Sequence, residues 1–220
     1  MLTLSTSARK LDVMARRSPA DPVRKRADRY HHGDLRRALL QAAVRTIQRH
    51  GVDGLTLRGV GSTLGVSRTA LYRHFTDKAA LLAAVADEGF RMLREQLTQA
   101  WGDGGRSLRG FEAMGVAYVR FAVAHPSHYR VMFGADVSAA EHAQLEEGAA
   151  AFQVLVDALT ALQEQKLARR DDTQQMALYV WATVHGVAML AIDGRLGPDR
   201  TAIDALTQYT TARIRAAITA

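Results

Sequence analysis

One stretch of twenty residues, TLRGVGSTLGVSRTALYRHF, constrains the fold of this chain more than any other. Leu57, Val60 and Leu64 recur at intervals of three and four, so a first short helix has one apolar face. Gly65 suits the position after a helix end, where positive φ is required, and Ser67 is a strong N-cap for a second helix. The stretch therefore predicts two short helices joined by a tight turn.

The second of these helices has two different faces. Leu71 and Phe75 are four residues apart and can both face inward, which leaves basic and polar side chains outside. This is the layout of a helix-turn-helix, whose second helix enters the major groove of DNA with its N-terminal residues toward base edges. An ordinary helical hairpin with a basic exposed face shares the same pattern. Lys78 follows Thr76 and Asp77, either of which can cap a new helix, and a cation there suits a phosphate.

The outward side chains of this motif are the expected DNA contacts. They are Thr56, Arg58, Ser67, Arg68, Thr69, Tyr72, Arg73, His74 and Lys78. We expect Lys78 and Tyr72 to hold phosphates, which position the protein without reading sequence. We expect Arg68, Thr69 and Arg73 to reach base edges, where sequence is read.

The positive charge of the chain is concentrated near its N-terminus. Residues 1–78 hold 16 Lys and Arg against 6 Asp and Glu, a balance of +10. The remaining residues hold 13 against 16, a balance of −3. A basic head on a mildly acidic body is typical of a polyanion-binding protein, although a merely solvated basic surface has the same composition. We interpret residues 1–32 as a disordered basic tail, either a solubilising leader or an arm that reaches a phosphate or the minor groove.

The composition indicates an all-α, soluble protein. Apolar residues make up 48% of the 220 residues, enough to bury a core in one large or two small domains. Four prolines and the lack of strand-like alternation favour helices throughout, and the absence of cysteine argues against a disulfide scaffold and thiolate zinc sites. We expect a cytoplasmic protein, because no secretion signal is recognisable and the longest unbroken apolar run, residues 79–86, is far shorter than a membrane span.

Apolar spacing, together with breaks at glycine and proline, divides the rest of the chain into helices. A helix is expected over 34–50, ahead of the motif, with Gly51 closing it in the positive-φ position after its end. The helices expected after the motif span 78–101, 108–124, 127–133, 139–166, 173–192 and 199–218.

Several short runs resemble the DNA-binding domain of the tetracycline-repressor (TetR) family over about residues 33–93. These runs are Gly51, Leu55-Thr56, Leu64-Gly65-Val66-Ser67, Leu71-Tyr72, His74-Phe75, Lys78 and Leu81-Leu82. The chain departs from the family pattern at Gly59 and Gly61, where helix formers are more common and each glycine costs ~1 kcal/mol of helix propensity. It departs again at Thr69-Ala70, where many members have glycine-threonine. The resemblance implies a three-helix head, 33–93, on a body, 94–220, whose last two helices form a four-helix dimer interface.

The body is rich in Met and aromatic residues, which suit an adaptable apolar cavity but equally fill an ordinary core. We expect a cavity enclosed by helices over 111–124, 139–166 and 173–192, with Arg120 as the one mid-body arginine on them, so a carboxylate ligand is a minority option. The expected ligand-binding residues are Phe111, Met114, Tyr118, Phe121, Phe152, Met176, Tyr179 and His185. Trp181, His185 and Gly186 together resemble the C-terminal signature of the Trp-His-Gly (WHG) branch of the family.

No catalytic, metal or cofactor site is expected. Glu146 and Glu147 are adjacent on a helix and point apart, so they do not form an acid–base pair. His185 has no nucleophile or paired acid beside it in the sequence. His31 and His32 lack an acidic or third imidazole partner nearby, and a solvated helix entrance is the better interpretation.

We therefore expect a DNA-binding transcriptional repressor that acts as a homodimer on a palindromic operator and is released by a small, mainly apolar ligand. Two other classes fit parts of the sequence: a DNA-binding structural protein with no effector, and an all-α enzyme with an incidental basic head. Sequence-selective DNA binding separates the first two classes from the enzyme. Ligand-dependent release separates the repressor from the structural protein.

Overall fold

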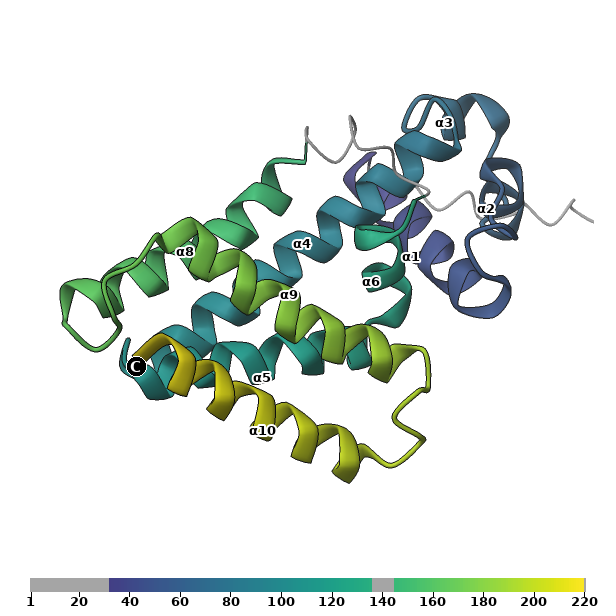
Figure 1. Ribbon diagram of the computed structural model, residues 1–220. Helices are drawn as coiled ribbons and strands as arrows, with labels where there is room; N and C mark the ends of the chain where they lie inside the picture. The colour runs from purple at the N-terminus through teal and green to yellow at the C-terminus, as the bar shows by residue number, and fades with distance from the viewer. Residues whose placement is uncertain (1–31, 136–144, 220) are drawn as a thin grey trace, which may run out of the picture.

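The computed structural model describes residues 32–135 and 145–219, which are helical except for short connections (Figure 1). The helices are α1 (His32–His50), α2 (Leu57–Thr63), α3 (Arg68–Tyr72), α4 (Lys78–Asp103), α5 (Leu108–Ala124), α6 (Pro126–Phe133), α8 (Glu146–Glu164), α9 (Thr173–Ile192) and α10 (Arg200–Thr219). The all-α fold expected from the sequence is confirmed. Almost all of the expected basic tail, His31 included, lies outside the described residues, as do the side chain of His32 and residues 136–144.

The helix ends of the head are fixed by side-chain caps and by two glycines. Thr56 and Ser67 each accept the backbone N–H three residues later, at 3.0 and 3.2 Å, and so begin α2 and α3. Asp77 does the same at 2.8 Å and begins α4. Gly51 and Gly65 have φ angles of +72° and +65°, which side chains rarely tolerate. The turn chemistry expected from the sequence is therefore present.

Local packing explains why glycine, and not a helix-forming residue, occupies positions 59 and 61 of α2. A Cβ at Gly61 would lie 3.0 Å from Leu71 Cδ2, so this glycine lets α2 and α3 approach closely. A Cβ at Gly59 would lie 2.8 Å from Thr56 Oγ1, the hydroxyl that caps the helix. Helix propensity is lost at both positions, and close packing and an unobstructed cap offset that loss.

Helix α4 joins the head to the body (Figure 1). It continues without a break for 26 residues and buries apolar side chains along most of its length. Leu81 and Leu82 are buried near its start, and Phe90 and Leu93 are buried farther along. Both α4 and α6 contact α1, so the head meets the body at two helices.

The body is a bundle in which α4 contacts α5, α6 and α8, and α5 contacts α9 and α10. Glycine permits two close approaches between its helices. A Cβ at Gly115 would lie 2.6 Å from Thr211 Cγ2, so α5 and α10 nearly touch there. A Cβ at Gly89 would lie 2.5 Å from Met132 Sδ, so α6 is seated directly against α4.

Most observed helix ends differ from the expected ones by one or two residues, while α5 and α9 have the expected bounds. The helix expected over 139–166 instead begins as α8 at Glu146, after the N-cap residue Leu145, and residues 139–144 of that expectation lie outside the described residues. Helix α6 begins at Pro126 rather than one residue later, because a first-turn proline lacks only an N–H that would have no helical partner. Helix α4 continues to Asp103, two residues past its expected end. Helix α8 ends before Lys166, whose φ of +57° is incompatible with a continuing helix.

By length and composition, α9 is long and apolar enough to cross a membrane, and it is the one such helix in residues 32–135 and 145–219. In this fold 39% of its apolar window is buried, and the helix contacts α5, α8 and α10. Core helices of soluble proteins pass the same test, so the finding is a weak indication of a membrane span.

Candidate DNA-binding surface and ligand cavity

Helix α3 directs its predicted base-reading side chains to solvent. Leu71 and Phe75, the inward residues of the motif, are buried in the core of the head. Arg68, Thr69 and Arg73 are exposed on the other side of the helix. The structure therefore places these three side chains together on an open surface, as the sequence pattern indicated.

The other predicted DNA contacts surround α3. Tyr72 is 44% exposed, Arg58 is exposed on α2, and His74 is half-buried just after α3. Thr56 and Ser67 are exposed, and each hydroxyl oxygen accepts a capping N–H. Because a hydroxyl also carries a proton, both residues retain a donor for a phosphate.

The cations on and around the helix-turn-helix, up to Lys78, have no carboxylate partner among the described residues. Within the described part of the chain, no arginine or lysine from residue 35 to residue 78 makes an ion pair. Arg36 instead lies over the ring of Phe75, with 5.5 Å between its guanidinium carbon and the ring centroid. Unpaired cations on one surface produce the positive potential that a polyanion requires.

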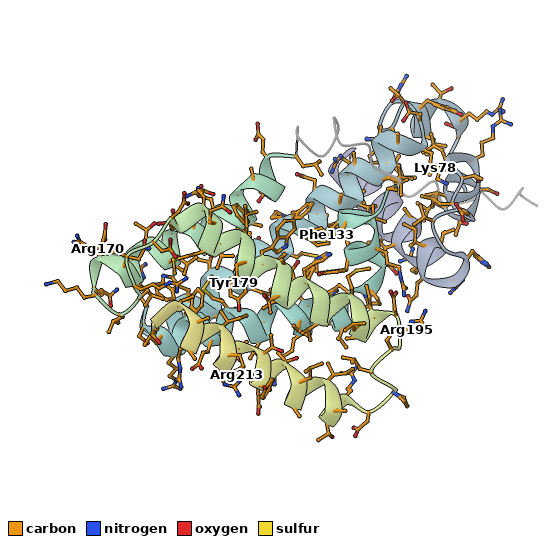
Figure 2. The ribbon with its side chains drawn as sticks, viewed as in Figure 1. Lys78, Phe133, Arg170, Tyr179, Arg195 and Arg213 are labelled. Atoms are coloured by element: carbon orange, nitrogen blue, oxygen red, sulfur yellow. The ribbon has the colours of Figure 1, made fainter. Side chains whose placement is uncertain are left out.

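Lys78 has a partner that the sequence did not indicate. Its Nζ donates to the backbone C=O of Val52 at 2.8 Å, and the residue is half-buried (Figure 2). This bond ties the first turn of α4 to the loop between α1 and α2. An ammonium has three donors, so Lys78 retains N–H groups for a phosphate while it holds the loop. Its phosphate contact stays a prediction.

The body contains a cavity of about 730 Å³. Its wall is mostly apolar and comes from α4, α5, α6, α8, α9 and α10, whose side chains meet in the centre of the body (Figure 2). Phe111, Met114, Tyr118 and Phe152, four of the predicted ligand-binding residues, lie at this wall. A cavity of this size and polarity is typical of a small-molecule site.

The other four predicted ligand-binding residues do not line this cavity. Phe121 is fully buried in the core, and His185 lies behind the cavity wall. Met176 and Tyr179 lie instead at a smaller pocket of about 340 Å³ beside the end of α10. Helix α9 turns Trp181 and its neighbours toward the large cavity, which leaves Tyr179 on the opposite side of the helix and 51% exposed.

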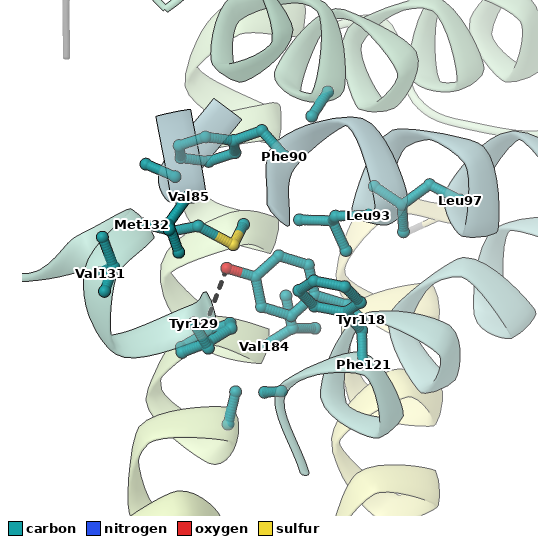
Figure 3. Close-up of a cluster of buried hydrophobic side chains, with 14 of the residues drawn as sticks. Val85, Phe90, Leu93, Leu97, Tyr118, Phe121, Tyr129, Val131, Met132 and Val184 are labelled. Carbon is teal, nitrogen blue, oxygen red and sulfur yellow. Dashed lines mark hydrogen bonds between the residues drawn. The ribbon is translucent and has the colours of Figure 1, made fainter. Parts of the chain in front are cut away.

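Three helices line the cavity that were not expected to do so. Helix α4 contributes Phe90, Leu93 and Leu97, and Figure 3 shows these side chains beside Tyr118. Helices α6 and α10 also contribute, with Phe133 from α6. The sequence did not indicate that α4, α6 and α10 line a cavity. Apolar residues have the same spacing on a helix that packs against solid core and on a helix that faces a cavity.

Four polar side chains meet at one part of the cavity wall. Trp181 Nε1 donates to Tyr118 Oη at 3.0 Å, and the Tyr118 and Tyr129 hydroxyls are 3.0 Å apart (Figure 3). His185 Nδ1 lies 2.7 Å from Tyr129 Oη and 3.1 Å from Tyr118 Oη. Tyr118 and Trp181 line the cavity, whereas Tyr129 and His185 lie behind them. We call these four residues the tyrosine–histidine cluster.

Burial decides the protonation of this cluster. It raises the pKa of Tyr118 to about 12, and it raises the pKa of Tyr129 as well. It lowers the pKa of His185, so the imidazole is neutral near pH 7 and its Nδ1 can accept. The two tyrosine protons then have acceptors inside the cluster, namely the histidine Nδ1 and the oxygen of the neighbouring tyrosine. Neither proton is available to the cavity.

Glu112 is the one charged side chain among the described residues at the cavity wall. It lies on α5, and its Oε2 is 3.3 Å from a terminal guanidinium nitrogen of Arg215 on α10. The Glu112 side chain is 26% exposed and that of Arg215 is 49% exposed, so the pair is at the edge of the bundle. This ion pair joins two helices of the wall.

A second polar contact joins α6 to α4. His128 Nε2 lies 3.3 Å from Glu88 Oε2, next to Gly89, where the two helices approach most closely. The hydrogen bond to His128 lowers the pKa of Glu88 below its ordinary value. Helix α6, which carries Met132 and Phe133 at the cavity wall, is thereby fastened to the helix that leads into the head.

The chain matches two family profiles. Residues 39–85 match a profile described as bacterial regulatory proteins of the tetR family, and residues 111–214 match one described as a tetracyclin repressor-like C-terminal domain. The first match covers the helix-turn-helix and the second covers most of the cavity-forming body. The resemblance to the WHG branch stays a prediction.

Curated relatives are similar over shorter lengths. The HTH-type transcriptional repressor AcnR of Corynebacterium diphtheriae is 36% identical over 64 residues, which are 29% of this chain and 34% of that protein. A class A tetracycline repressor protein of Escherichia coli, from transposon 1721, is 44% identical over 62 residues, which are 28% of this chain and 27% of that protein. The chain thus matches about a third or less of the length of these relatives.

Solved structures are similar over most of the chain. A protein of unknown function from Rhodococcus sp. RHA1 is 32% identical with a TM-score of 0.75, and the match covers 88% of this chain and 100% of that one. The fatty acid degradation regulator FadR of Bacillus halodurans is 14% identical with a TM-score of 0.70, over 81% of this chain and 93% of that one. At that identity the second likeness shows a shared fold alone.

Proposed function

Because this chain belongs to the TetR family of regulatory proteins, we propose that it is a cytoplasmic repressor that binds a palindromic operator as a homodimer. A small, mainly apolar molecule in the body cavity would release it from DNA. Helix α4 is the observation that carries this proposal. Lys78 at its start holds the head loop at Val52, and Phe90, Leu93 and Leu97 farther along the same helix line the cavity. A molecule in the cavity therefore contacts the helix that positions the head.

Helix α6 supplies a second connection of the same kind. Met132 and Phe133 line the cavity, and the same helix contacts α1 of the head. Its His128 bonds Glu88 of α4. A ligand that displaces α6 or α4 would change the position of the head, and thereby the spacing of the two heads in a dimer. By linkage, operator DNA must weaken ligand binding by the same factor as the ligand weakens operator binding.

An exposed apolar face on α9 and α10 supports the homodimer. Tyr179 and Leu190 on α9 are 51% and 46% exposed, and Tyr209 on α10 is 59% exposed. The two helices contact each other at one side of the body (Figure 1). Large apolar side chains gathered on one surface mark an interface, and a two-fold dimer buries the same patch of both copies. This is the pair of helices that the family resemblance implied.

Operator selection tests the DNA-binding part of the proposal. Sites are selected from a random duplex pool with the full chain, and the selected site is footprinted while the mass of the complex is measured by sedimentation. We expect two inverted half-sites bound by two chains, because two-fold protein symmetry requires two-fold DNA symmetry. One unrepeated half-site bound by a single chain would contradict the homodimer.

Ligand-dependent release tests the regulatory part. An apolar compound library is screened for thermal stabilisation, which rises as RT ln(1 + [L]/Kd) for a ligand of the native state. Each hit is then tested for weaker operator binding, with Met114→Trp as the variant whose cavity is filled. We expect hits that release the wild type and fail with the variant. If no hit changes operator affinity, the effector-independent DNA-binding protein replaces the repressor.

A further inference from the structure

Among the described residues, the side-chain hydrogen-bond donors at the cavity wall are all used within the protein. The indole N–H of Trp181 donates to Tyr118 Oη, and the hydroxyl proton of Tyr118 is hydrogen-bonded inside the tyrosine–histidine cluster. Thr211 Oγ1 donates to the backbone C=O of Gln208 at 3.1 Å. In the part of the wall that residues 32–135 and 145–219 form, no tryptophan, tyrosine or threonine proton is therefore free to bind a ligand oxygen.

One strong acceptor remains. Glu112 offers a carboxylate at the wall, and its Oε2 is bonded to Arg215. Its Oε1 has no partner among residues 32–135 and 145–219. Arg215 is not itself part of the wall and is directed at the carboxylate from α10. The described side chains of the cavity thus present an acceptor and a negative charge to a ligand, and no free donor.

Resting on the proposed function, we propose that the ligand is an apolar molecule with one cationic or hydrogen-bond-donating group that lies against Glu112, and that the cavity rejects carboxylates. A carboxylate in this apolar space would lose its water without gaining a side-chain donor, and it would be repelled by Glu112. An ammonium group instead meets a charged acceptor that is already desolvated in part. A neutral hydroxyl group on the ligand can donate to the same Glu112 carboxylate, but the attraction is weaker than that of an ammonium group.

Three probes with the same ten-carbon chain isolate the polar group: decan-1-amine as its ammonium ion, decan-1-ol, and decanoate. Their affinities for the full-length protein are measured by calorimetry at pH 7.5, below the micellar concentration of each probe. We expect the order ammonium, then alcohol, then carboxylate, with about 100-fold or more between the first and the last. Met114→Trp should weaken all three, which places the binding in this cavity.

A pair of matched variants tests the role of Glu112. Glu112→Gln keeps the shape of the side chain and should lower the affinity for the ammonium probe about tenfold while leaving the alcohol within about threefold. Asp204→Asn is the control, because the Arg120–Asp204 pair also joins α5 to α10, at 3.7 Å, and neither residue lines the cavity. This control should leave all three affinities unchanged.

A third variant distinguishes the effect of Glu112 on ligand binding from that of its ion-pair partner, Arg215. Arg215→Gln removes the cation that neutralises the carboxylate, so the ammonium probe should bind several-fold more tightly. If Arg215 were instead the receptor of an anionic ligand, the same variant would abolish decanoate binding.

The outcomes distinguish this inference from the function on which it rests. Decanoate binding at least as tightly as the ammonium probe, with no effect of Glu112→Gln, overturns the ligand class and leaves a ligand-released repressor intact. The expected order of affinities without any change in operator binding supports the ligand class and overturns ligand release. No binding of any probe to a folded wild-type protein overturns both.

Discussion

In the head, Arg58, Arg68 and Arg73 point to solvent without an acidic partner in the described residues, whereas several arginines of the body pair with carboxylates of the body: Arg94, Arg120, Arg130, Arg169 and Arg215. Arg94 makes a two-pronged contact with Glu147, at 2.7 and 3.2 Å, which joins α4 to α8. The body uses cations to connect helices. The head leaves its arginines for a partner outside the chain, and on a DNA-binding fold we expect that partner to be DNA, through its phosphates and base edges.

The same difference extends to neutral polar groups. On the head, Thr56 and Ser67 retain hydroxyl protons at the surface after they cap their helices. In the body cavity, Tyr118, Trp181 and Thr211 direct their protons into the protein. A surface with free hydrogen-bond donors suits an anionic partner such as a phosphate. A cavity without free donors suits a ligand that itself carries a hydrogen-bond donor. Four substitutions test this difference between the head and the body.

The largest expected effect is on stability and comes from the body. Phe121→Ala removes a fully buried ring and should lower the free energy of unfolding by ~3–5 kcal/mol, because the cavity left behind is only partly filled. Tyr72→Ala, on the head surface, should change it by less than about 0.5 kcal/mol and still weaken operator binding. Urea unfolding and operator titration measure the two quantities. Equal losses of stability would show that the head surface is structural after all.

The next effect is on base preference. Arg68→Ala should cost ~1–3 kcal/mol at one operator position if its guanidinium makes a bidentate contact with a base. Arg94→Ala is the matched control, because that guanidinium is engaged with Glu147 in the body. Operator variants measured with both proteins decide the assignment. A relaxed preference in the Arg94 variant, or none in the Arg68 variant, would contradict it.

Lys78→Ala should act on affinity and on the fold together. Loss of one phosphate contact flattens the log–log salt dependence of binding by ~0.9, equally for all DNA sequences. Loss of the bond to the Val52 carbonyl should also lower the free energy of unfolding by about 1 kcal/mol. Salt titrations and urea unfolding measure the two effects separately. If Lys78→Ala altered the base preference, Lys78 would have to be reassigned from a phosphate contact to a base contact.

The smallest expected effect is a pH dependence that belongs to the body. Burial lowers the pKa of His185, so the folded state binds fewer protons than the unfolded state below the ordinary histidine value of about 6.5. Stability should therefore fall as the pH drops through 6.5, and the loss should level off below the folded pKa. His185→Gln, which does not titrate, should reduce this slope in urea unfolding from pH 7.5 to 5. If the slope of unfolding free energy against pH is unchanged in His185→Gln, the pH dependence would be assigned to His125, whose pKa is also lowered by burial.

The head was largely predictable from its sequence. Thr56, Gly65 and Ser67 act within three or four residues of their own positions, so their spacing alone indicates the caps and the turn. The apolar spacing of Leu71 and Phe75 indicated which side of α3 is buried, and hence which side faces outward. The bond from Lys78 to Val52 was missed, because it joins residues 26 apart and no local pattern records it.

Which apolar residues of the body fill the core and which line the cavity could not be predicted from local sequence, because it depends on how distant helices pack. Phe121 and Phe111 both lie on the apolar face of α5 and both are buried, yet one fills the core and the other lines the cavity. Apolar spacing fixes which side of a helix leaves water. Whether that side meets another side chain or an empty volume depends on the packing of helices far apart in the chain, as does the convergence of Tyr118, Tyr129 and His185 from three helices into one hydrogen-bonded cluster.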